Sequence, residues 1–146
     1  MTVLLDTHIW IWWLTRDAHL PARESQALNA KASRGELRLA AISLWEAQML
    51  HAKSRLRLPA PFADWLRQAA SPDVLEVLPL DVEVALALDD LPRSFHGDPA
   101  DRVIAATARA HALPLATRDA AIRRSRAVRL WKPDGPGMRG RRKEMR

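Results

Sequence analysis

Short apolar segments without the polar alternation of a half-exposed strand recur along this chain, separated by segments of helical periodicity. The clearest is 2–5 (TVLL), and strand-like segments also occupy 37–40, 75–80 and 114–117. A strand without alternation is buried on both faces, as in a parallel sheet covered by helices. The pattern predicts a three-layer α/β/α domain with a mainly parallel central sheet of four to five strands, the fifth being an edge strand at 128–131.

Start and stop signals place helices between these strands. Helices are expected over 8–14, from Pro21 to about Ser33 with Gly35 closing it, from Ser43 to about Arg55, over 62–70, 81–91 and 99–112, and just after Asp119. Asp98 and Pro99 are favoured residue types for an N-cap and a first helical position. Ser43 stands three residues before Glu46, which is the spacing of a capping box at the start of one helix.

The net charge of +6 is unevenly distributed along the chain. Residues 135–146 contain five Arg or Lys and one Glu, which gives a net of +4. We therefore expect one folded domain over 1–131, a length typical of a single domain, and a basic, disordered tail over 132–146. The positive charge favours polyanionic partners such as nucleic acid, although the folded part is only mildly basic.

The absence of cysteine excludes disulfides, thiolate metal sites and thiol nucleophiles. Any metal ion must then be held by oxygen or imidazole ligands. The apolar opening MTVLLDTHIWIWWL is interrupted by Asp6 and His8 and lacks the basic start of a signal peptide. It also falls short of the roughly 20 uninterrupted residues that a membrane span needs. We expect no membrane association and a cytoplasmic location.

Carboxylates occur where a parallel sheet forms its ligand sites. Asp6 and Asp119 stand at or just past the ends of two predicted strands, and the ligand crevice of an open α/β sheet lies beyond those ends. A turn or a helix cap would also explain either residue alone. Glu46 shares a helix face with Met49 and Leu50, so its carboxylate is predicted within an apolar stripe, where burial without a partner is costly.

Two further carboxylates, Asp98 and Asp101, open the predicted helix at 99–112. A capping role explains Asp98 fully, whereas Asp101 either reaches back toward the helix start or faces the crevice. Carboxylates that are brought together raise one another's pKa and are relieved by a divalent cation. Ligation by oxygen alone suits Mg²⁺ or Mn²⁺, and such an ion activates a water for phosphodiester hydrolysis.

Four segments resemble the signature blocks of PIN-domain ribonucleases, and above all those of the VapC-type toxins of type II toxin–antitoxin systems. The segments are LLDTHIWIWWL at 4–14, SLWE at 43–46, HGDPADRVIAATA at 96–108 and LATRD at 115–119. They recur in the order found in the family, and the resemblance covers residues 1–131 as a PIN-like nuclease domain. One departure is Ala100, which stands where an aromatic residue is common in the family.

The resemblance implies which residues form the site and what they do. The family's acidic quartet falls on Asp6, Glu46, Asp101 and Asp119, which are then catalytic, and Asp98 matches a further acid of the DPxDR subgroup. All five are implied ligands of Mg²⁺ (or Mn²⁺). The implied activity is endonucleolytic cleavage of RNA by a homodimer that a cognate antitoxin inhibits. The alternatives are a PIN-like module that binds RNA or protein without cutting, and a phosphotransferase, for which the DxD pair is missing.

The hydroxyl and guanidinium groups next to these acids have two interpretations each. Thr7 and Thr117 match small hydroxyl positions of the family, where they orient a water or a carboxylate, or serve structure alone. Arg102 and Arg118 contact RNA phosphate or simply balance the acids.

Overall fold

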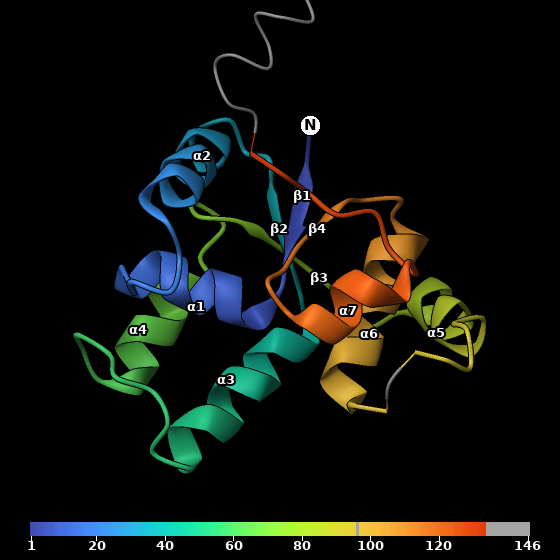
Figure 1. Cartoon of the computed structure of the whole chain (residues 1–146). Helices are drawn as coiled ribbons and strands as arrows, with labels where there is room; N and C mark the ends of the chain where they lie inside the picture. The colour runs from blue at the N-terminus through green and yellow to red at the C-terminus, as the bar shows by residue number, and fades with distance from the viewer. Residues whose placement is uncertain (96, 134–146) are drawn as a thin grey trace, which may run out of the picture.

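A parallel sheet between two layers of helices forms the body of the computed structural model, which describes residues 1–95 and 97–133 (Figure 1). The strands are β1 (Val3–Leu5), β2 (Leu37–Ala40), β3 (Glu76–Leu78) and β4 (Leu115–Ala116). The helices are α1 (Thr7–Thr15), α2 (Ala22–Ser33), α3 (Ile42–Ala52), α4 (Phe62–Ala69), α5 (Val82–Asp89), α6 (Pro99–Ala110) and α7 (Ala120–Ser125). The predicted three-layer α/β/α fold is confirmed.

The strand order is β3-β2-β1-β4, and each neighbouring pair of these strands is parallel. Leu5, the last residue of β1, lies opposite Leu39 of β2 and Ala116 of β4, so the carboxyl ends of three strands lie at one edge. The predicted edge strand at 128–131 is reduced to a single parallel bridge between Leu130 and Leu115. Within the described residues the sheet therefore has four strands.

Separate apolar cores fill the two faces of the sheet. Leu5 of β1 belongs to the core beneath α1, α2 and α4, together with Trp10 of α1. Leu4 points the other way and packs with Ile104 of α6 and Ile122 of α7. Because both faces are covered, as the missing polar alternation predicts, a site on this sheet must lie at the end of the strands. In Figure 1, α3 runs below that end.

The predicted capping box at Ser43 is wrong. β2 ends at Ala40, and only Ala41 separates it from α3, which begins at Ile42. Ala41 is the N-cap and makes no side-chain hydrogen bond. Ser43 consequently lies inside the helix, where its buried hydroxyl oxygen is 2.8 Å from the hydroxyl oxygen of Thr7. Since the strand-to-helix connection is so short, the helix starts before the residues that local spacing favoured.

The other predicted helix signals agree with the structure. Asp98 is the N-cap of α6, and its carboxylate accepts a hydrogen bond from the backbone N–H of Asp101 at 3.0 Å. Gly35, with φ +70°, follows α2 in a left-handed conformation that favours glycine. Two helices end somewhat earlier than predicted: α3 stops at Ala52 and α6 at Ala110.

The predicted basic tail at 132–146 lies outside the described residues from position 134 onward, so it stays a prediction. His96, the first residue of the third resembling segment, also lies outside them. No helix in the described part of the chain has both the length and the apolar character needed to cross a membrane.

Candidate active site

Two of the predicted acids lie just beyond the ends of neighbouring strands. Asp6 comes one residue after β1 and is the N-cap of α1, and Asp119 comes soon after β4 and is the N-cap of α7. Since β1 and β4 are parallel neighbours, both acids lie at the same edge of the sheet. Each also caps a helix, so the capping role and the strand-end position coexist in one residue.

Asp6 is held rigidly by its neighbours. Its side chain is 5% exposed, and one carboxylate oxygen accepts a hydrogen bond from the Thr7 backbone N–H at 2.7 Å. The other oxygen accepts one from the Thr117 hydroxyl, also at 2.7 Å. The Thr117 oxygen in turn accepts the backbone N–H of Asp119 at 3.0 Å. Thr117 thus orients a carboxylate and joins the ends of β1 and β4.

Glu46 brings a half-buried carboxylate from α3. Its Oε1 atom is buried and has no hydrogen-bond partner among the described residues. Burial raises the pKa of Glu46, an effect that the nearby Thr7 hydroxyl opposes and the charges of Asp6 and Asp98 reinforce. An unpartnered buried carboxylate oxygen is costly in free energy, and a bound cation would satisfy it.

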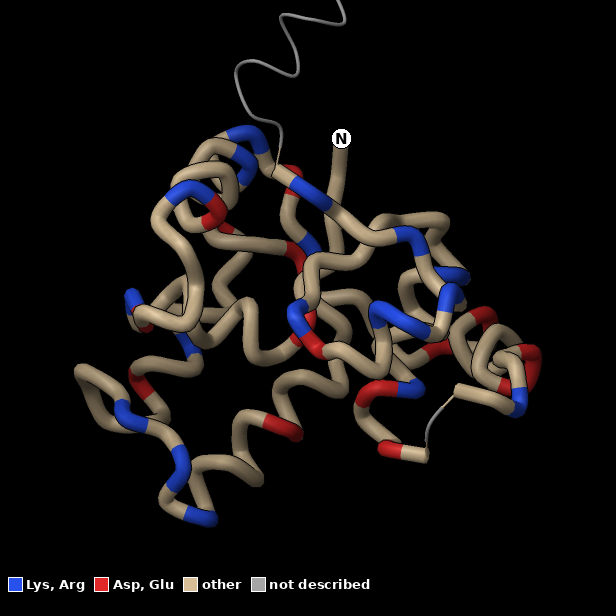
Figure 2. Tube along the Cα trace, in the orientation of Figure 1, with Lys and Arg blue, Asp and Glu red and all other residues tan. Residues whose placement is uncertain are grey.

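Three carboxylates converge closely enough to share one cation. Ligand oxygens of Glu46, Asp98 and Asp101 all lie within 4.8 Å of one another. Asp98 is exposed at the start of α6, whereas Asp101, one turn further along, is half-buried. Figure 2 shows acidic segments of α3 and of the starts of α6 and α7 around the carboxyl end of the sheet.

The charges of the other four acids act on Asp101. Its pKa is raised to about 8, chiefly by burial and then by the negative charges of Asp6, Asp98, Asp119 and Glu46. Burial also raises the pKa of Asp6, against the lowering effect of its hydrogen bond from Thr117. Asp6 and Asp119 therefore lie within electrostatic reach of the three converging acids, although they are not part of the 4.8 Å group.

The sequence located the acids but missed the hydroxyl pair that joins two helices behind them. Thr7 of α1 and Ser43 of α3 are both buried, and their oxygens lie 2.8 Å apart. This contact joins the helix that Asp6 caps to the helix that bears Glu46. A buried Ser on an apolar helix was the available signal, since a buried hydroxyl needs a partner.

Oxygen ligands, mutual repulsion and one unsatisfied buried oxygen fit a hard divalent cation. Mg²⁺ and Mn²⁺ prefer such carboxylate sites and often join them to phosphate groups. The described cluster contains no cysteine or histidine ligand that would favour a softer metal.

Comparisons with known proteins identify the family. Residues 3–127 match the model of the PIN domain family. The chain is 39% identical over 133 residues to ribonuclease VapC22 of Mycobacterium tuberculosis, covering 89% of this chain and 98% of that one.

Two solved structures share the fold. VapBC2 from Rickettsia felis, bound to a promoter DNA fragment, has a TM-score of 0.67 at 18% identity and covers 92% of this chain and 100% of its own. FitAcB from Neisseria gonorrhoeae has a TM-score of 0.64 at 24% identity, with 90% and 98% covered. The chain belongs to the PIN domain family.

Proposed function

We propose that this protein is a metal-dependent endoribonuclease that acts as the toxin of a toxin–antitoxin pair. The observation that carries the proposal is the convergence of Glu46, Asp98 and Asp101 within 4.8 Å at the carboxyl end of a PIN sheet. The identity to a ribonuclease over nearly its whole length supports RNA as the substrate. Asp6, Glu46, Asp101 and Asp119 are the proposed catalytic residues.

The proposed cation is Mg²⁺ or Mn²⁺, held by Glu46, Asp98 and Asp101 with Asp6 and Asp119 beside them. When bound, such an ion supplies Lewis acidity at a phosphodiester and offsets the charge that develops during hydrolysis by water. Such an ion would also satisfy Oε1 of Glu46, which is buried without a hydrogen-bond partner among the described residues.

The chain's own residues orient the acids and hold a proton. Thr117 fixes one oxygen of Asp6, and the Thr7–Ser43 contact sets α3 against the start of α1. With a pKa of about 8, Asp101 is largely protonated at neutral pH and gives up its proton when a cation takes its place. The acids are thereby positioned before the substrate arrives.

The proposal is tested by incubating the purified protein, freed of any partner, with total cellular RNA. Cleavage is expected with Mg²⁺ or Mn²⁺, is expected to stop in EDTA, and should leave 5′-phosphate and 3′-hydroxyl ends, read by end-labelling. Total RNA is the substrate because selectivity for one RNA would make a single oligonucleotide uninformative. Undiminished cleavage in EDTA, or intact RNA with both cations, would contradict the proposal.

The proposed assembly is a homodimer that a cognate antitoxin inhibits. An exposed apolar surface is available for self-association: Val82 and Leu86, one turn apart on α5, are 70% and 59% exposed, and Leu80 just before them is 54% exposed. Neighbouring apolar side chains of this size on a helix surface mark protein interfaces when they form a contiguous patch.

Replacing both Val82 and Leu86 with glutamate is therefore expected to shift the protein from dimer to monomer, because the dimer would have to bury four unpaired charges. Light scattering after size-exclusion chromatography measures the mass. The control is Ala63→Glu with Gln68→Glu, two exposed positions of α4. A wild-type protein that is already monomeric at micromolar concentration would contradict the dimer.

A further inference from the structure

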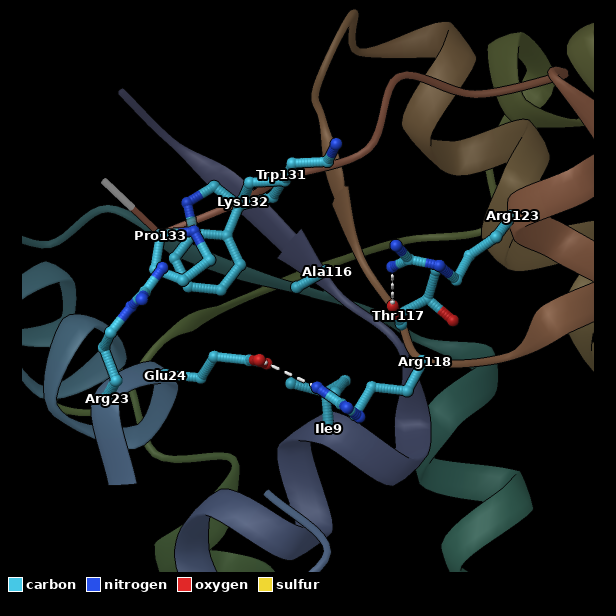
Figure 3. Close-up of a pocket in the computed structure, with 10 residues that line it drawn as sticks. All are labelled: Ile9, Arg23, Glu24, Ala116, Thr117, Arg118, Arg123, Trp131, Lys132 and Pro133. Carbon is cyan, nitrogen blue, oxygen red and sulfur yellow. Dashed lines mark hydrogen bonds and ion pairs between the residues drawn. The ribbon is translucent and has the colours of Figure 1, made fainter. Parts of the chain in front are cut away.

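A cavity that does not include the acidic cluster opens beside it. It has a volume of about 400 Å³ and lies between α2, the end of β4 and the segment 131–133 (Figure 3). That volume is within the range of roughly 300–1,000 Å³ typical of small-molecule sites. The cavity reaches the proposed active site, because Thr117 lines it and donates to the buried carboxylate of Asp6.

The lining of this cavity is strongly basic. Its charged lining residues are four cations and one acid. The cations are Arg23, Arg118, Arg123 and Lys132, and the acid is Glu24. Glu24 is paired with Arg118 at 2.7 Å, and Arg123 donates to the Thr117 carbonyl oxygen at 3.1 Å. Arg23 and Lys132 are exposed, and their side chains form no ion pair or hydrogen bond within the described residues. These two cations are available to an anionic ligand.

An aromatic ring completes the cavity wall. Trp131 is half-buried, and its backbone N–H donates to the Leu115 carbonyl oxygen at 2.9 Å, which anchors it beside β4. In Figure 3, Trp131 lies with Lys132 and Pro133 on one side of the cavity, and the Arg23 side chain extends toward them from α2. Cationic groups beside an aromatic plane are the combination with which proteins bind single-stranded nucleic acid.

We propose that this cavity is a subsite for a nucleotide of single-stranded RNA that flanks the scissile bond, an inference that rests on the proposed ribonuclease function. Arg23 and Lys132 bind the RNA phosphates, and Trp131 stacks on a base. Binding there is indifferent to base identity, because every base offers a face for stacking. The five nearby acids repel the RNA polyanion. A basic subsite beside them offsets that repulsion and holds the RNA strand in a fixed position relative to the acidic cluster.

RNA fits this cavity better than an acidic protein segment does. A peptide carboxylate would use the cations but not the indole face, whereas a nucleotide uses both. The shared residue Thr117 also allows one continuous strand to occupy the subsite and the acidic cluster together.

The test measures binding of a fluorescein-labelled single-stranded RNA by anisotropy in EDTA, where no metal-dependent cleavage occurs. The variant is Arg23→Ala with Lys132→Ala. The matched control is Arg67→Ala with Lys53→Ala, which removes the same residue types and the same charge at exposed positions on α4 and at the end of α3. At about 0.1 M salt, each lost phosphate contact is worth about fivefold in affinity and about 0.7 in the slope of log affinity against log salt.

The Arg23/Lys132 variant is accordingly expected to bind about 25-fold more weakly, with a salt slope reduced by about 1.4, while the control stays near wild type. Trp131→Leu should weaken binding about fivefold or more and leave the salt slope unchanged. Its thermal unfolding midpoint verifies that the variant is folded.

Equal weakening in the variant and its control would overturn the subsite, as would a poly-glutamate peptide that binds as tightly as RNA of the same charge. The cleavage assay separates the two proposals. If the protein cleaves RNA but the Arg23, Lys132 and Trp131 variants bind RNA as tightly as wild type, only the subsite is overturned. An intact RNA substrate whose binding still depends on those three residues overturns the nuclease alone.

Discussion

Replacing Asp101 with asparagine is expected to lower RNA cleavage at least about a hundredfold, since even residues one shell beyond a metal ligand change activity by about 10- to 100-fold. The protein should remain folded. With a pKa of about 8, Asp101 is already mostly neutral at pH 7 without metal, so a neutral amide of the same shape stays close to the form that the folded protein holds. Cleavage of total RNA with Mg²⁺ measures the first effect and thermal unfolding in EDTA the second.

The matched control is Asp73→Asn, an exposed acid in the turn between α4 and β3, which should cleave RNA at the wild-type rate. An Asp101→Asn protein that retains wild-type cleavage would remove this residue from the proposed site. A variant that is inactive but also unfolded in EDTA would contradict the assigned protonation of Asp101.

The stability of the metal-free protein is expected to fall as the pH rises from about 4 to 8. The folded-state pKa of Asp101 lies above its ordinary value of 3.8, so the folded protein holds a proton that the unfolded chain has released. That contribution is fully present below pH 4 and is lost as the pH passes through about 8. Thermal unfolding in EDTA between pH 5 and pH 9 measures it, and Asp101→Asn should show a flatter profile than wild type.

Metal binding should show the matching dependence, because a cation competes with that proton. Mg²⁺ affinity is expected to rise up to about tenfold per pH unit and to level off above pH 8. Calorimetry in buffers of different ionisation enthalpy counts the protons released. A pH-independent affinity, or identical unfolding profiles for wild type and Asp101→Asn, would show that Asp101 holds no such proton.

Part of the site was predictable because its residues occupy positions set by the chain's local order. Asp6 follows an apolar segment that predicts a buried strand, and parallel strands bring their carboxyl ends to one edge of the sheet. Asp98 before Pro99 marks a helix start, and the structure has both residues in those positions. These inferences needed only strand and helix periodicity.

Glu46 shows where local inference ends. The spacing from Ser43 fits a capping box, and the apolar neighbours fit a buried ligand. The single-residue connection between β2 and α3 rules out the capping box, because it starts the helix before Ser43. Oε1 of Glu46 is buried without a hydrogen-bond partner among the described residues. The spacing of residues in the sequence does not predict the geometry of that connection.

The chain's sequence by itself determined the fold class and the identity of the candidate acids, because buried strands, helix caps and charge are properties of neighbouring residues. Tertiary structure alone decided that Thr117 meets Asp6 across 111 residues, that Asp101 has a pKa of about 8, and that a basic cavity opens beside the acids. The physical reason is that burial and Coulomb interactions depend on distances through space, which only the packed sheet and helices set.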